Sequence, residues 1–130
     1  MKAIIVKIAG KTYNLAFNGA AMFEIREKYD SVEDMLEITA QDDQGGFIAM
    51  CETVALLATQ GELARRYFGY DPQEMIEAET IQNIVQPHEI IELTTAIPRA
   101  VALGFGAEID RGKDDEIDLT LMELNQKKTV

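Results

Sequence analysis

Apolar side chains in the middle of the chain recur with the spacing of a helix. Between residues 46 and 69, the apolar or small positions are Phe47, Met50, Cys51, Val54, Leu57, Ala58, Gly61, Ala64 and Phe68. An i, i+3, i+4, i+7 pattern of this kind places one wide apolar stripe along a single helix. Glu52, Thr59 and Glu62 fall largely on the other side. We expect this helix to form the floor of a small core that the preceding and following segments cover.

The N-terminal residues follow the alternating pattern of strands. Residues 2 to 8 are rich in isoleucine and valine, and Gly10 separates them from a stretch in which Tyr13, Leu15 and Phe17 alternate with smaller or polar residues. This pattern predicts a β-hairpin. A lone hairpin is marginal in water, so its apolar side must lie on the helices or its edge must pair with another chain. An edge left in solvent or covered by a loop is the alternative.

Two shorter helices are predicted between the hairpin and the central helix. Asn18 can cap a helix that runs to about residue 29, with Ala21, Met22 and Ile25 on its apolar stripe. Ser31 and Asp34 resemble a capping box at the start of a second, short helix. The polar stretch from residue 39 to residue 46 then predicts a loop.

Proline positions organise the region after the central helix. Asp71 and Pro72 predict an N-cap and a first helical position, with one or two turns of helix over residues 73 to 78. Helical spacing continues until Pro87, which predicts the start of a long helix ending near residues 104 to 106. Pro98 lies inside that helix, where it predicts a kink or an interruption near residues 94 to 97.

The composition changes abruptly after Gly106. Residues 108 to 118 contain six acids and two bases, which predicts a solvated, mobile linker. A short apolar cluster follows, consisting of Leu119, Leu121, Met122 and Leu124. Such a cluster can dock on its own domain, dock on another protein, or stay disordered. The predicted fold is therefore α+β and mostly α: residues 1 to 106 form a hairpin packed on four to five helices, and residues 107 to 130 form a flexible acidic tail.

Composition narrows the class of protein. The 130 residues carry 23 acids against 12 bases, a formal net charge of -11. Such a balance argues against binding to a nucleic-acid backbone and favours solubility and a basic partner. Cys51 is the only cysteine, so no internal disulfide can form and a reduced cytoplasm is expected. The N-terminal apolar run is too short for a signal sequence or a membrane span.

No combination of residues predicts catalysis. Cys51 lies on the apolar stripe, where a thiol is typically an inert core residue, and His88 is the only histidine. One cysteine and one histidine do not make a zinc site. The acidic runs at residues 42 to 46 and 110 to 115 lack the order of a calcium loop and could bind a divalent ion only weakly. We expect no catalytic, cofactor or metal site.

Cations and aromatic rings lie close together at the end of the central helix, in Arg65-Arg66-Tyr67-Phe68-Gly69-Tyr70. Stacking on single-stranded nucleic acid is one interpretation. In so acidic a chain, we expect the rings to complete the core and the arginines to pair with acids, which leaves an exposed remainder for protein binding. The candidate partner-binding residues are Tyr67, Phe68, Tyr70, Leu119, Leu121, Met122 and Leu124.

The order of these features resembles the tail assembly chaperones of long-tailed bacteriophages and prophages, specifically the short product made without ribosomal frameshifting. The resemblance spans nearly the whole chain and rests on loose patterns of residue type. The stretches that carry it are Lys11-Thr12-Tyr13-Asn14-Leu15-Ala16-Phe17, Ala20-Ala21-Met22-Phe23-Glu24-Ile25, Val54-Ala55-Leu56-Leu57-Ala58, Pro87-His88-Glu89-Ile90-Ile91-Glu92-Leu93, Glu116-Ile117-Asp118-Leu119-Thr120-Leu121 and Lys127-Lys128.

The resemblance implies a non-catalytic helical protein that works in the host cytoplasm and is not part of the mature virion. Members of that family bind the tape-measure protein and help tail-tube subunits assemble around it. Self-association through the hairpin edge is a further expectation from the residues. The competing interpretation is an acidic inhibitor or immunity-type protein that blocks a basic partner. A small enzyme would have to rely on carboxylates alone.

Overall fold

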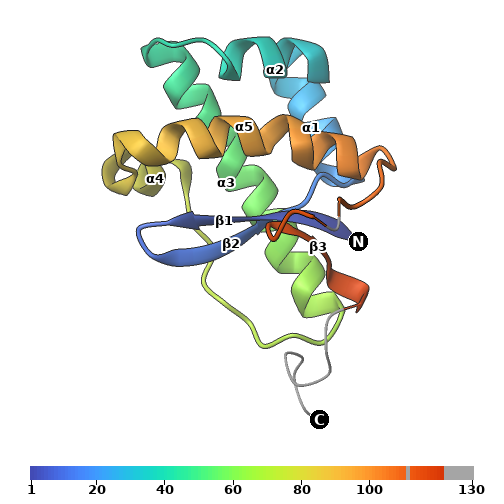
Figure 1. The fold of residues 1–130 in the computed structure, drawn as a ribbon. Coiled ribbons are helices and arrows are strands. Elements are labelled where there is room, and N and C mark those ends of the chain that lie inside the picture. The colour runs from blue at the N-terminus through green and yellow to red at the C-terminus, as the bar shows by residue number, and fades with distance from the viewer. Residues whose placement is uncertain (111, 122–130) are drawn as a thin grey trace.

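The computed structural model describes residues 1 to 110 and 112 to 121. Within these residues the chain folds into a three-stranded sheet and five helices, which confirms the predicted α+β, mostly α class. Helices α1 (Gly19–Tyr29), α2 (Val32–Thr39) and α5 (Pro87–Gly104) gather on one side of the sheet. The long helix α3 (Gln44–Tyr67) begins among them, crosses the sheet and projects beyond it (Figure 1).

The N-terminal hairpin forms as predicted. Strand β1 (Lys2–Ile8) pairs antiparallel with β2 (Lys11–Leu15), and Ile8 lies opposite Lys11. Ala9 and Gly10, with φ of 51° and 82°, form the tight turn between them. Two positive φ values in a two-residue turn match the twist of the flanking strands. The apolar side of the hairpin packs on the helices, and Ile4, Ile8 and Leu15 are completely buried.

Helix α3 is the central element of the core. Asp43 caps its first turn by accepting a hydrogen bond from Gly46 N at 2.7 Å. The helix has the length and apolar composition of a membrane span, but 61% of its most apolar stretch is buried inside the fold. Where α3 crosses β2 the backbones nearly touch, because a Cβ on Gly61 would lie 1.8 Å from the Asn14 carbonyl oxygen. Glycine at this position is therefore a packing requirement.

The two shorter helices begin at the predicted caps. Asn18 Oδ1 accepts a hydrogen bond from Ala21 N at 2.9 Å and starts α1. Ser31 Oγ accepts one from Asp34 N at 3.0 Å and starts α2. Asp30, with φ of 72°, makes the sharp break between the two helices. Both caps satisfy backbone donors that the first turn of a helix leaves unpaired.

Helix α5 begins at Pro87, as predicted, with a capping box between Gln86 and Glu89. Of the two outcomes expected near residues 94 to 97, a kink or an interruption, the interruption is wrong, because α5 is continuous through Pro98. Proline removes one backbone hydrogen bond from a helix. The buried residues around it, including Ile97 and Ala100, pack this part of α5 into the core. Burial on this side keeps the helix continuous despite the missing bond.

The predicted mobile linker is wrong for its C-terminal part. Residues Glu116–Asp118 form strand β3, which pairs antiparallel with β1 and places β1 at the centre of the order β2-β1-β3. The chain continues into a 3-10 turn at Leu119–Leu121, and Leu119 is completely buried. The domain therefore extends to about residue 121, beyond the boundary predicted at residue 106. Met122 and Leu124 lie outside the described residues.

The helix predicted over residues 73 to 78 is also wrong. Residues 71 to 77, which we call the strap, have no regular secondary structure, and α4 (Ala78–Ile84) begins only after them. Ile76 is 5% exposed and anchors the strap in the core, while the residues from Asp71 to Met75 are exposed. The cause lies in charged side chains of α3, which bind the strap backbone.

Candidate functional site

A buried ion network occupies the last turns of α3. Glu62 and Arg65 are only 6% and 8% exposed. Arg65 Nη1 donates to Glu62 Oε1 at 2.6 Å, and Arg66 Nε donates to Glu62 Oε2 at 2.9 Å. One carboxylate therefore accepts from two arginines on the same helix. This geometry confirms the expectation that these arginines pair with nearby acids.

The same network binds the strap. Arg65 Nη1 donates to Asp71 O at 3.1 Å, and Arg66 Nη2 donates to Gln73 O at 2.9 Å. Gln73 N donates to Glu62 Oε2 at 2.8 Å. Burial alone would raise the pKa of Glu62, but the bonds from Gln73, Arg66 and Arg65 outweigh it and lower the pKa. The strap forms no helix because these side chains, rather than a helical ladder, bind its backbone.

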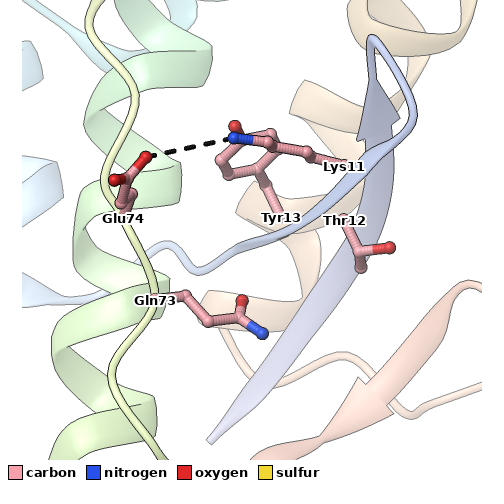
Figure 2. A pocket seen from close by; sticks show the side chains of 5 residues that line it. All are labelled: Lys11, Thr12, Tyr13, Gln73 and Glu74. Carbon is pink, nitrogen blue, oxygen red and sulfur yellow. Dashed lines mark ion pairs between the residues drawn. The ribbon is translucent and has the colours of Figure 1, made fainter.

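Between the strap and β2 lies a trough. Its central cavity has a volume of about 520 Å³ and is lined by Lys11, Thr12 and Tyr13 on one side and Gln73 and Glu74 on the other. Figure 2 shows the two walls facing each other, with Lys11 and Glu74 reaching across the gap. Lys11 Nζ lies 3.9 Å from Glu74 Oε2, and both side chains are mostly exposed. Exposed pairs of this kind contribute little to stability.

The trough continues along β2 in both directions. A cavity of about 370 Å³ shares Lys11, Tyr13 and Glu74 with the central one and extends toward α4. A second cavity of about 370 Å³ shares Thr12 and Gln73 and extends over the face of the sheet, where Ile5 and Ile117 line it, toward Tyr70. The trough therefore opens at one end toward α4 and at the other onto the face of the sheet.

Backbone groups of β2 face this trough. The N–H of Ala16 points away from the hairpin and donates to Leu57 O of α3 at 3.1 Å. Successive residues of a strand direct their backbone groups to opposite edges, so Asn14 and Thr12 share the outward direction of Ala16. The Asn14 carbonyl is covered by Gly61. The N–H and C=O of Thr12 and the N–H of Asn14 therefore point outward without a strand partner among the described residues.

The predicted partner-binding residues separate into a buried and an exposed group. Tyr70 is 2% exposed, and its hydroxyl donates to Leu119 O at 2.5 Å. Tyr70, Leu119 and Ala64 form one small apolar cluster, with Phe68 and Ile117 packed against it. The structure thus brings two predicted groups together and removes Tyr70 and Leu119 from the exposed set. Nothing is described for the side chain of Leu121, and Met122 and Leu124 lie outside the described residues.

Tyr67 and part of Phe68 remain exposed. Tyr67 is 83% exposed, and its ring meets the Phe68 ring edge-on with centroids 5.1 Å apart. Leu63, one turn earlier on α3, is 45% exposed. We call Leu63, Tyr67 and Phe68 the α3 patch. Sequence reasoning missed Leu63, because nothing in the helical pattern signals that this part of α3 projects beyond the sheet.

The residues considered for nucleophilic chemistry are not arranged for it. Cys51 is completely buried, and burial, reinforced by the neighbouring Glu52 charge, raises its pKa to about 11. The thiol is therefore protonated at neutral pH. His88 is exposed at the start of α5. Over residues 1 to 110 and 112 to 121, no group of three or more histidine, cysteine, aspartate or glutamate side chains could hold a metal ion.

Comparison with known proteins finds no matching protein-family model, no matching curated protein and no matching solved structure. Among the described residues, the α3 patch and the trough along β2 are two surfaces at which a partner could bind.

Proposed function

We propose that this protein is a non-catalytic tail assembly chaperone of a bacteriophage or prophage. In this proposal it binds the tape-measure protein in the host cytoplasm, helps recruit tail-tube subunits and is absent from the mature virion. The observation that carries the proposal is the combination of a strongly acidic chain with highly exposed apolar side chains. Those side chains include Tyr67, Ile91, Phe105 and Phe23, which are 83%, 74%, 65% and 61% exposed.

The α3 patch is the surface we assign to the partner helix. An aromatic ring that is mostly exposed gains contact area on binding at little entropic cost, and tyrosine is enriched at binding hot spots. Leu63 and Tyr67 are four residues apart and so lie on one face of α3. An apolar stripe of a long helical protein can pack against this face. The net charge of -11 helps to keep such a complex in solution.

An acidic inhibitor of a basic protein is the second candidate. The net charge and the three acids of the strap, Asp71, Glu74 and Glu77, favour it. The two functions differ in their response to salt. Binding through apolar contacts changes little with ionic strength, whereas binding between opposite charges weakens steeply.

The test is co-expression with the longest helical protein encoded beside this one. The variant with Leu63→Ser and Tyr67→Ser alters only exposed side chains. Glu33→Ser, on the exposed side of α2, is the matched control. A truncation at Gly106 is unsuitable, because it removes β3 and Leu119 from the fold.

We expect the intact protein and the control to keep the partner soluble and to co-purify with it at low and high salt. The double variant should bind about tenfold more weakly, as for the loss of a hot-spot residue. If the intact protein, the control and the double variant bind the partner equally well, the partner does not contact the α3 patch. If none binds this partner while a basic toxin or nuclease is captured only at low salt, the inhibitor function replaces the chaperone function.

A further inference from the structure

We propose that the trough between β2 and the strap binds an extended, basic segment of a partner polypeptide, which adds to the sheet as a fourth strand beside β2. The site is separate from the α3 patch and does not depend on the proposed chaperone function. It is identified by three features that lie side by side: outward backbone groups, a partly apolar hollow and an acidic wall.

The backbone groups of β2 can pair with an added strand but not with the strap. Thr12 lines the central cavity, and both its N–H and its C=O point to the outer edge of β2, as the direction of Ala16 requires. On the opposite wall, Gln73 N and Gln73 O are already bonded to Glu62 and Arg66. The strap therefore stays a wall of the trough. A segment lying between them can exchange hydrogen bonds with Thr12, which is the usual source of affinity in strand addition.

A partly apolar hollow at one end of the trough can hold a side chain of that segment. It has a volume of about 370 Å³, and Tyr13, Met75 and Ile84 are among the residues that line it. Met75 and Ile84 are 40% and 38% exposed, so their apolar surface is open to an incoming group. Alternate side chains of a strand point to opposite sides. One apolar residue of the segment can therefore enter this hollow while its neighbours point elsewhere.

The charges around the trough indicate that the bound segment is basic. The strap carries Asp71, Glu74 and Glu77 with no base of its own. Arg65 and Arg66 also reach the strap, but both are bonded to Glu62 and to strap carbonyls. The cation that faces the exposed acids across the trough is Lys11. The ion pair between Lys11 and Glu74 is exposed to solvent, so an incoming segment can break it at little cost in free energy. Two copies of a chain with a net charge of -11 repel each other, which disfavours pairing of two β2 edges. Lysine or arginine in the segment would meet the acidic wall with opposite charge.

The experiment is an NMR titration of the full-length protein, with amide hydrogen exchange, using a blocked pentapeptide in which lysine and valine alternate. We expect the amide signals of Thr12 and Asn14 to shift and their exchange to slow. A peptide with glutamate in place of lysine should bind much more weakly. The same lysine peptide with every backbone nitrogen methylated should also fail, because it lacks the donors for strand pairing.

Variants test the acidic wall. Glu74→Gln with Glu77→Gln should weaken binding of the lysine peptide roughly threefold to tenfold, as expected for two exposed charges. Glu33→Gln with Glu37→Gln makes the same change of charge on α2 and should leave binding unchanged. The proposal is overturned if the peptide produces no change at Thr12, or if the methylated or acidic peptide binds equally well. It is also overturned if the free protein is already a dimer with a protected Thr12 amide, because a second copy then occupies the edge.

Discussion

The strap and the C-terminal segment from Asp115 to Leu119 are both held by arginines on helices, but with opposite effects on the sheet. Arg99 of α5 binds Asp115 through two hydrogen bonds of 2.5 and 2.8 Å, and Ile5 N donates to Asp115 O at 2.7 Å. The C-terminal segment thus joins the sheet as β3. Arg65 and Arg66 instead hold the strap through its carbonyls, beside β2 but not paired with it.

This difference shows that an arginine can either complete a sheet or keep one of its edges open. Arg99 binds a side chain, so the backbone around Asp115 stays free to pair with β1. The α3 arginines bind backbone carbonyls, so the strap has fewer groups left for β2. One edge of the sheet is consequently covered from Lys2 to Ile5, while the other faces a trough at Thr12.

The largest expected effect comes from breaking the network that holds the strap. Glu62→Gln removes the charge that pairs with Arg65 and Arg66 while keeping the size of the side chain. Because Arg65 is then left buried without its partner charge, we expect unfolding in urea to show a loss of about 3 kcal/mol. Proteolysis should cut the strap faster. Glu74→Gln, at an exposed position, is the control and should change stability by less than about 0.5 kcal/mol. Equal stability of the two variants would contradict the role assigned to the network.

Removing the buried anchor of the C-terminal segment should have a somewhat smaller effect. Leu119→Ala leaves a cavity beside Tyr70 and Ala64, for which we expect a loss of about 2 to 3 kcal/mol in urea unfolding. The amide of Ile5 should exchange faster, because β3 detaches more often. Thr120→Ala, at an exposed neighbouring position, is the comparison. If Leu119→Ala leaves the free energy of unfolding unchanged, the C-terminal segment is not part of the core.

Weakening the Arg99 contact should have a milder effect. Asp115→Asn keeps the backbone bond from Ile5 but loses the paired charge, and both side chains are partly exposed, at 23% for Arg99 and 42% for Asp115. We expect a loss of about 1 kcal/mol, measured by urea unfolding at low ionic strength. The loss should shrink in high salt. A loss as large as that of Leu119→Ala would show that the ion pair, and not the apolar anchor, holds β3.

Lowering the pH should weaken the attachment of both the strap and the C-terminal segment. The bonds from Arg99 lower the pKa of Asp115, and hydrogen bonds that outweigh burial lower the pKa values of Glu62 and Asp118. A carboxyl with a lowered pKa binds fewer protons in the folded state than in the unfolded state, so its stabilising effect is complete above its ordinary pKa and is lost below it.

The ordinary pKa values are 4.5 for glutamate and 3.8 for aspartate. The urea midpoint should therefore be level above about pH 5.5 and fall as the pH drops through 4.5 and below. Glu62→Gln, although less stable throughout, should show a shallower fall. The same slope in both proteins would mean that Glu62 does not contribute to the acid sensitivity.

Local sequence signals predicted the elements that local chemistry determines. The caps at Asn18 and Ser31, the start of α5 at Pro87 and the apolar stripe of α3 all lie within a few residues of the structure they set. The strap and β3 were mispredicted because distant groups determine them. An Asp-Pro pair predicts a helix start, but Gln73 pairs with Glu62 eleven residues earlier in the chain.

The candidate site was predicted only in part, for the same reason. The acidic composition around Asp115 suggests a solvated linker, yet its partner Arg99 is on α5 and the strand it continues into pairs with β1. Tyr70 and Leu119 were predicted to bind a partner, but the fold buries them against each other. The trough could not be foreseen, because it depends on the extended strap.

The most direct test of this account is amide hydrogen exchange in the free protein, measured by NMR at Ile5 and Thr12. Both amides belong to strands of the same sheet and point away from the hairpin's inner ladder. Ile5 N donates to Asp115 O, whereas Thr12 N faces the trough. The account predicts slow exchange at Ile5 and exchange at Thr12 faster by at least about a hundredfold, the difference between a paired strand amide and an open one. Equal protection at the two amides would show that the β2 edge is already closed and would contradict the contrast between the strap and β3.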